Sequence, residues 1–156
     1  MTHNFERLKA HILPLSCSQD FNQAKKEWDL ISIEISKEYD FCPCGKEIKE
    51  HCYIKNKRTG HTTYVGNVCV NRFIGIKTNS LFAGLKRIAE DNTKSPSEAL
   101  ILYAYNSGYL YEGEYEFLMA VRLKKTLSAN QIAWRRKINR RILNQIVVQK
   151  RNHQST

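Results

Sequence analysis

The spacing of hydrophobic positions along this chain changes twice, and each change predicts a different kind of element. Residues 3–13 carry apolar side chains three and four positions apart, which predicts a helix that Pro14 ends. A second helix is expected from an N-cap at Ser18 to about Trp28. The N-terminal segment is therefore predicted to be helical.

Alternating apolar and polar residues predict strands in the next part of the chain. Isoleucine alternates with polar residues over 31–35, as in a half-buried strand. Residues 51–56 and 61–65 are expected to form two strands of a hairpin, joined by a turn at 57–60. These segments predict a small antiparallel sheet.

From residue 79 onward the apolar spacing is helical again. A first helix is expected after a cap at Ser80, and a second from the capping box Ser95-Pro96-Ser97-Glu98, with proline at the first helical position. Residues 106–108 are expected to end that second helix. A third helix is predicted over about 114–125.

The last predicted helix runs from a cap at Ser128 to about Val148. Its apolar stripe has four-residue spacing and consists of Trp134, Ile138, Ile142 and Ile146. The C-terminal half is therefore expected to form a helical bundle.

Four of the five cysteines lie within 28 residues, between the first strand and the end of the hairpin. The segment Cys42-Pro43-Cys44-Gly45 predicts a tight turn that aims two sulfur atoms at one point. Such a cluster suits a structural Zn²⁺, and its expected ligands are Cys42, Cys44, Cys52 and Cys69. An odd number of clustered cysteines also favours metal binding in a reducing compartment over disulfides.

One position of this ligand set has alternatives. His51 and Cys52 point to opposite faces of one strand, so only one of them reaches the metal. Cys52 is preferred because a thiolate matches the other three ligands, and His61 is a weaker substitute. Cys17 stands apart and is expected to be a core or loop thiol. The alternative for the whole cluster is that the cysteines are small buried hydrophobic residues.

The elements and the cysteines together predict an α+β fold, in which a zinc-stapled β-hairpin or small antiparallel sheet precedes a C-terminal helical bundle. The expected parts are N-terminal helices at 1–29, a zinc-ribbon β unit at 30–78 and a basic helical region at 79–156. We expect these parts to pack as one compact domain.

The predicted metal site is not expected to be catalytic. A catalytic zinc keeps an open coordination position, whereas four thiolates close the shell. The sequence also has no Walker A motif, no dinucleotide-binding glycine pattern, no nucleophile elbow and no nucleobase-deaminase signature. A non-catalytic protein is predicted, with a metal-dependent hydrolase or nuclease as the less favoured alternative.

The net charge of +10 originates in the last quarter of the chain. Residues 1–116 contain 15 Lys/Arg and 15 Asp/Glu, whereas residues 117–156 contain ten Lys/Arg and no acid. A surface of one sign attracts polyanions, nucleic acid above all, although a solvated helix face that only helps solubility is the simpler alternative. The side chains expected to bind nucleic acid or an acidic protein surface are Arg135, Arg136, Lys137, Arg140 and Arg141 on the last helix, and Lys55, Lys57 and Arg58 on the hairpin.

Two tyrosines of the hairpin have two possible roles. Tyr53 and Tyr64 are able to stack on bases, as in single-strand binding, but simple packing over a small ribbon core is the favoured interpretation.

The composition indicates an ordinary globular protein of 156 residues, 42% hydrophobic and 26% charged. No run of 18 apolar residues is present, which predicts no membrane span. The N-terminal segment has no apolar stretch of the kind found in secretory signals, so a cytoplasmic location is expected.

The cysteine stretch also resembles a known group of sequences. Its motif is Cys-x-Cys-Gly-x-x-Ile, then Cys-x-Ile-x-Asn-x-x-Thr-Gly, then Val-Gly-Asn-x-Cys-Val-x-x-Phe, and it starts at Cys42, Cys52 and Val65. This pattern looks like that of small zinc-ribbon proteins of bacteriophages and bacterial mobile elements. The downstream residues Glu116-Phe117, Leu127-Ser128 and Gln131 resemble those beside such ribbons. The resemblance covers about residues 28–145 and implies a zinc site and a fold unit, but no activity.

These observations favour a cytoplasmic, zinc-stabilised nucleic-acid-binding protein of phage or mobile-element type. The alternative is an inhibitor or regulator of a host or defence nucleoprotein that presents its basic helix to an acidic groove on the partner.

Overall fold

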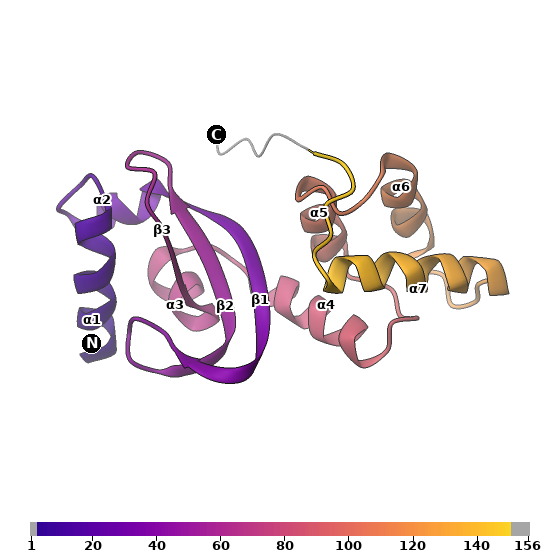
Figure 1. The fold of residues 1–156 in the computed structure, drawn as a ribbon, viewed down its shortest axis with the longest axis horizontal. Helices are drawn as coiled ribbons and strands as arrows, with labels where there is room; N and C mark the ends of the chain where they lie inside the picture. The colour runs from indigo at the N-terminus through magenta and orange to yellow at the C-terminus, as the bar shows by residue number, and fades with distance from the viewer. Residues whose placement is uncertain (1–2, 151–156) are drawn as a thin grey trace. The chain divides into compact units, whose positions relative to one another are not determined.

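The computed structural model describes residues 3–150, which form two compact units (Figure 1). Unit 1 comprises residues 3–79 and unit 2 comprises residues 80–150. The fold is α+β, as predicted, with a three-stranded antiparallel sheet in unit 1 and helices in unit 2. The predicted N-terminal helices and the predicted β unit lie together in unit 1.

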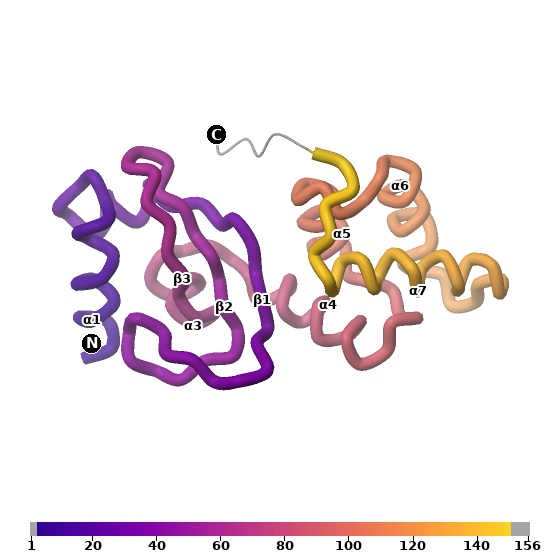
Figure 2. Tube along the Cα trace, in the orientation of Figure 1, coloured from indigo at the N-terminus to yellow at the C-terminus, as the bar shows by residue number. Residues whose placement is uncertain are grey.

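The sheet of unit 1 has the strand order β1-β2-β3, with β1 at Trp28–Phe41, β2 at Glu47–Asn56 and β3 at Thr62–Gly66. All three predicted strands are present. β1 is much longer than predicted, because it continues past a register shift between Ile35 and Asp40 and pairs with β2 again up to Phe41. Figure 2 traces this path, in which β2 lies between β1 and β3.

The N-terminal segment contains α1 (His3–Ile12), which ends in a short 3₁₀ helix at Leu13–Leu15. The second predicted helix is present but much shorter than the expected span from Ser18 to Trp28. α2 covers only Phe21–Ala24, a 3₁₀ turn follows, and Trp28 already belongs to β1. Asp20 and not Ser18 is the N-cap of α2, and the backbone N–H of Ser18 donates to the side chain of Glu27.

A short helical segment follows the sheet. α3 (Asn67–Cys69) continues into a π-helix at Val70–Ile74 and ends at Gly75, whose φ of 91° lies in the left-handed region. The local sequence pattern does not predict this helix. The sheet, α1 and this segment share a core that includes Leu8, Ile12, Ile33, Ile54, Val65 and Val70.

Unit 2 contains the four predicted helices: α4 (Asn79–Glu90), α5 (Glu98–Asn106), α6 (Glu112–Val121) and α7 (Ala129–Leu143). α5 starts two residues later than expected, because Ser97 is the N-cap and accepts from the Leu100 N–H, so Pro96 precedes the helix. None of the helices in the described part of the chain has the length and apolar character needed to cross a membrane.

α7 begins as predicted and ends early. Ser128 and Gln131 form a reciprocal capping box at its start. The helix stops at Leu143 instead of Val148, because the chain turns back and the N–H groups of Val148 and Gln149 donate to the Gly108 carbonyl. Ile138 and Ile142 are buried as predicted, whereas Ile146 and Trp134 are exposed.

Candidate metal centre and basic surfaces

Three cysteines of unit 1 bring their sulfur atoms together. The Sγ atoms of Cys42, Cys44 and Cys69 all lie within 4.8 Å of one another, and those of Cys42 and Cys69 are 3.7 Å apart. All three side chains are buried. Buried soft donors at this separation can hold a metal ion, and we call this group the cysteine triad.

The turn between β1 and β2 supplies two members of the triad. Its shape is set by two backbone hydrogen bonds, from Cys42 N–H to the Lys46 carbonyl and from Gly45 N–H to the Cys42 carbonyl. Gly45 has a φ of 100°, which favours glycine, and a Cβ there would overlap the guanidinium of Arg7 from α1. The predicted tight turn is therefore present, and it brings Cys42 and Cys44 close to each other.

The third member comes from α3, directly after β3. Gly66 ends that strand, and its N–H donates to Cys42 Sγ at 3.3 Å. A Cβ on Gly66 would lie 2.9 Å from Ile48 Cγ2, so a larger residue would require the Ile48 side chain to move. The first turn of α3 then directs Cys69 back toward the β1–β2 turn.

Within the triad, the pKa values of Cys42 and Cys69 shift in opposite directions. The hydrogen bond with the Cys69 thiol lowers the pKa of Cys42 to about 6, and the N–H groups of Cys44 and Gly66 act in the same direction against burial. The same contact with Cys42, together with burial, raises the pKa of Cys69. These contacts favour the thiolate form of Cys42, which is the form that binds metal.

Cys52 does not join the triad. Its side chain is fully buried, and its Sγ lies 3.8 Å from the Thr78 hydroxyl oxygen. Burial raises the pKa of Cys52 to about 12. Among the described residues, no further Cys, His, Asp or Glu completes the group of three. The ligand role of Cys52 stays a prediction.

The two alternative histidine ligands lie elsewhere. His51 points to the face of β2 opposite Cys52, where its Nε2 is 3.4 Å from an Asp40 carboxylate oxygen. His61 is exposed next to the hairpin turn. Cys17 is exposed as well, which agrees with a loop thiol.

The two hairpin tyrosines pack against each other and against His51. Their ring centroids are 6.1 Å apart, and the Tyr64 ring lies 4.9 Å from that of His51. The Tyr53 hydroxyl donates to Glu34, and the Tyr64 hydroxyl donates to the Phe41 carbonyl. These contacts agree with the packing role that the sequence analysis favoured.

The predicted basic residues of α7 fall into two groups. Arg135 donates through Nε to the Thr93 carbonyl, and Arg141 pairs with Glu114 and donates to the Tyr109 carbonyl. These two guanidinium groups therefore make contacts within unit 2. Arg136, Lys137 and Arg140 are exposed.

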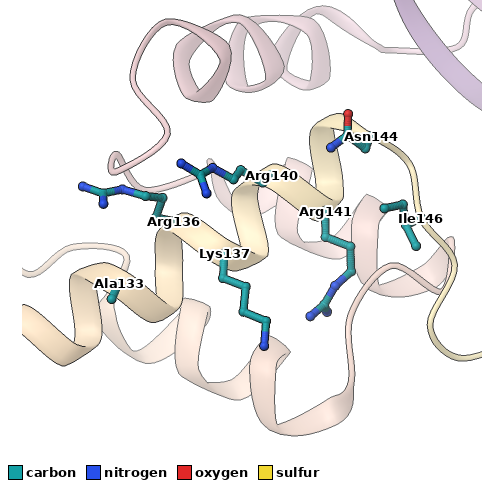
Figure 3. A pocket seen from close by; sticks show the side chains of 7 residues that line it. All are labelled: Ala133, Arg136, Lys137, Arg140, Arg141, Asn144 and Ile146. Carbon is teal, nitrogen blue, oxygen red and sulfur yellow. The ribbon is translucent and has the colours of Figure 1, made fainter.

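The three exposed cations of α7 line an open pocket of about 460 Å³. Ala133, Asn144 and Ile146 complete its wall together with Arg141, and we call this site the α7 pocket. Figure 3 shows Arg136 and Arg140 extending in one direction from the helix and Lys137 in another. Asp91 lies close enough to Arg136 for this cation to lower the pKa of that carboxyl, after the larger effect of hydrogen bonds from Thr93.

A second pocket, of about 410 Å³, lies in unit 1. Lys57 and Arg58 line it together with Lys26, which the sequence analysis missed because it comes from the turn before β1. Lys57 lies 3.9 Å from an Asp29 carboxylate oxygen, and the buried Glu27 is also part of the wall. Lys55 is exposed on β2. Lys57 and Arg58 thus lie beside acidic side chains.

No protein-family model matches this chain, and comparison with curated proteins and with solved structures yields no significant match. The resemblance to zinc-ribbon proteins of phages and mobile elements stays a prediction.

Proposed function

We propose that this protein is a non-catalytic, zinc-stabilised nucleic-acid-binding protein of phage or mobile-element type that acts in the cytoplasm. The observation that carries the proposal is the α7 pocket, which three exposed cations line. It lies in the part of the chain, from residue 117 onward, that contains no acid. A polyanion is the partner that such a surface attracts most strongly.

The spacing of these cations suits a sugar–phosphate backbone. Arg136 and Arg140 are four residues apart, so their Cα atoms are separated by about 6 Å along the helix axis. Two long side chains at this separation reach neighbouring phosphates of one strand, and guanidinium groups bind phosphate oxygens in pairs. Such contacts carry affinity without base specificity.

The proposed metal is Zn²⁺ in a structural role. A tetrahedral zinc with Zn–S bonds of about 2.3 Å places its sulfur ligands about 3.8 Å apart. The 3.7 Å separation of Cys42 and Cys69 matches this value. The ion would connect the β1–β2 turn to α3 and so stabilise the hairpin.

The test is the salt dependence of binding to duplex and single-stranded DNA and RNA. Each lost phosphate contact lowers the slope of log K against log salt by about 0.7 to 0.9, so R136E/R140E should reduce it by about 1.4 to 1.8 and weaken binding at least tenfold. K124E/K125E is the matched control, because it changes the charge equally at exposed positions outside the pocket. Equal losses in both variants, or no binding at low salt, would refute the proposal.

The second candidate is a protein that inhibits or regulates a nucleoprotein complex. The favouring observation is apolar exposure in unit 2, where Leu123 is 79% exposed and Trp134, stacked on Phe117, is 41% exposed. Exposed tryptophans are frequent anchors of protein interfaces. A stoichiometric partner that survives nuclease treatment and is lost in W134A would favour this candidate.

A further inference from the structure

We infer that the metal centre is a three-cysteine site, in which Cys42, Cys44 and Cys69 bind the ion and Cys52 is a positioning residue that acts through Thr78. The inference rests on the proposed function in one respect, namely that the protein binds a metal ion. It differs from the four-cysteine set that the sequence predicted.

The triad already has the geometry of a ligand set. Its three sulfur atoms come from two segments, the β1–β2 turn and α3, and converge within 4.8 Å. The Gly66 N–H donates to Cys42 Sγ, a backbone contact of the kind that supports metal-bound thiolates.

Cys52 lies in a different environment from the triad. It is in the middle of β2, where it pairs with Ile33 on one side and Val65 on the other, and its side chain is fully buried. Its sulfur contacts the Thr78 hydroxyl at 3.8 Å. Cys52 is near enough to Cys42 for the charge of that thiolate to raise the pKa of Cys52, after the larger effect of burial, but its sulfur does not lie within 4.8 Å of all three triad sulfur atoms.

Thr78 connects Cys52 to the helix that carries Cys69. The Thr78 hydroxyl donates to Asn67 Oδ1 and accepts from Asn71 Nδ2 at 2.8 Å. Asn71 also accepts from the Thr78 N–H at 3.0 Å. Asn67 is the first residue of α3, two positions before Cys69. Cys52 thus supports a hydrogen-bonded network that fixes the start of α3.

The fourth position of a tetrahedral ion is then filled by a ligand that is not a cysteine. Within residues 3–150, no other Cys, His, Asp or Glu donor belongs to the group. A fourth position without a protein ligand is also found in catalytic zinc sites, so in this inference the non-catalytic role rests on the lack of catalytic motifs and not on a closed shell. Soft ions such as Zn²⁺, Cd²⁺ and Co²⁺ are the appropriate probes, because thiolates bind them well.

The first experiment uses the unmodified full chain loaded with ¹¹³Cd. Scalar coupling between the metal and cysteine Hβ protons identifies the ligands directly in NMR spectra. We expect coupling to Cys42, Cys44 and Cys69 and none to Cys52. Coupling to Cys52 would overturn the inference and leave the proposed function intact, whereas failure to bind any metal would refute both the inference and the zinc part of the proposal.

The second experiment tests the positioning role with variants loaded with Co²⁺. C52A and T78V should keep one ion per chain and the thiolate-to-cobalt absorbance of the wild type, while lowering affinity by about 10- to 100-fold, as loss of outer contacts does. C44A should lose part of that absorbance. C17A should behave as wild type, because Cys17 is exposed outside the site.

A matched core variant separates positioning from general stability. I54V removes one methylene from a buried side chain of β2 on the same face as Cys52. It should lower the free energy of unfolding but leave metal affinity within twofold of wild type. If I54V weakens metal binding as much as T78V does, or if C52A reduces the thiolate absorbance, the inference is wrong.

Discussion

Glu27 connects the loop before the sheet to the hairpin through a single buried carboxylate. One of its oxygens accepts from the Cys17 N–H and the Asn56 amide, and the other accepts from the Ser18 N–H. Asn56 in turn accepts from two N–H groups of the hairpin turn. Burial alone would raise the pKa of Glu27, but these hydrogen bonds hold the pKa below its ordinary value.

We expect E27Q to lower the free energy of unfolding by about 2 kcal/mol, because an amide leaves at least one buried donor without an acceptor. The folded pKa is depressed, so the contribution of Glu27 is present above its ordinary pKa and is lost as pH falls toward the folded value. Urea unfolding at a series of pH values measures this. The difference between wild type and E27Q should therefore shrink below about pH 4.5.

E38Q is the control for this prediction, since Glu38 is exposed. Its unfolding free energy should stay within about 0.5 kcal/mol of wild type. A pH-independent difference between E27Q and wild type would contradict the ionised state of Glu27.

At the scale of elements, two neighbouring arginines of α7, Arg140 and Arg141, have different environments. Arg141 lies against the start of α6, where Glu114 closes a capping box with the Tyr111 N–H, and both side chains of this ion pair are about nine-tenths buried. Arg140 is exposed in the α7 pocket. Arg141 therefore connects α7 to α6, whereas the preceding residue, Arg140, is available to a ligand.

We predict opposite consequences for R141M and R140M. R141M should lower the free energy of unfolding by about 3 kcal/mol, because it leaves the Glu114 charge buried without its partner. R140M should change stability by less than about 0.5 kcal/mol, but it should weaken nucleic-acid binding. Chemical denaturation and binding titrations of both proteins measure this. An equal loss of unfolding free energy in R141M and R140M would contradict the structural role of Arg141 and the binding role of Arg140.

At the scale of the whole molecule, the two units are stabilised by different means. Unit 1 combines a small sheet with the cysteine triad, whereas the described part of unit 2 contains helices with capping boxes at α6 and α7 and no cysteine. A metal ion that binds the folded form of unit 1 stabilises that form alone.

Chelation should therefore affect the two units unequally. We expect a strong chelator to increase amide hydrogen exchange in residues 42–69 and to leave exchange in residues 98–143 close to that of the metal-loaded protein. Hydrogen exchange measured by mass spectrometry resolves both segments in one experiment. C42A should show the exchange pattern of the chelated protein without a chelator. Uniform exchange changes in both segments would contradict the prediction.

The sequence by itself determined the helices of unit 2, because caps and apolar spacing act within a few residues. Ser128 and Gln131 needed no distant partner to start α7. The strands and the clustering of cysteines were likewise visible in local patterns. The sequence could also predict that basic residues gather on one helix.

Only the tertiary structure decided where long-range contacts override these local signals. Glu27 accepts from the N–H groups of Cys17 and Ser18 and so holds the loop in which a helix was predicted to start, and α2 begins only at Phe21. Gly108 accepts from Val148, so the chain leaves α7 after Leu143. Cys52 lies beside Thr78 and not in the triad, and Arg141 pairs with Glu114. Each outcome depends on a partner at least nine residues away in the chain. Spacing along a sequence does not encode such partners, because they are set by which faces pack together.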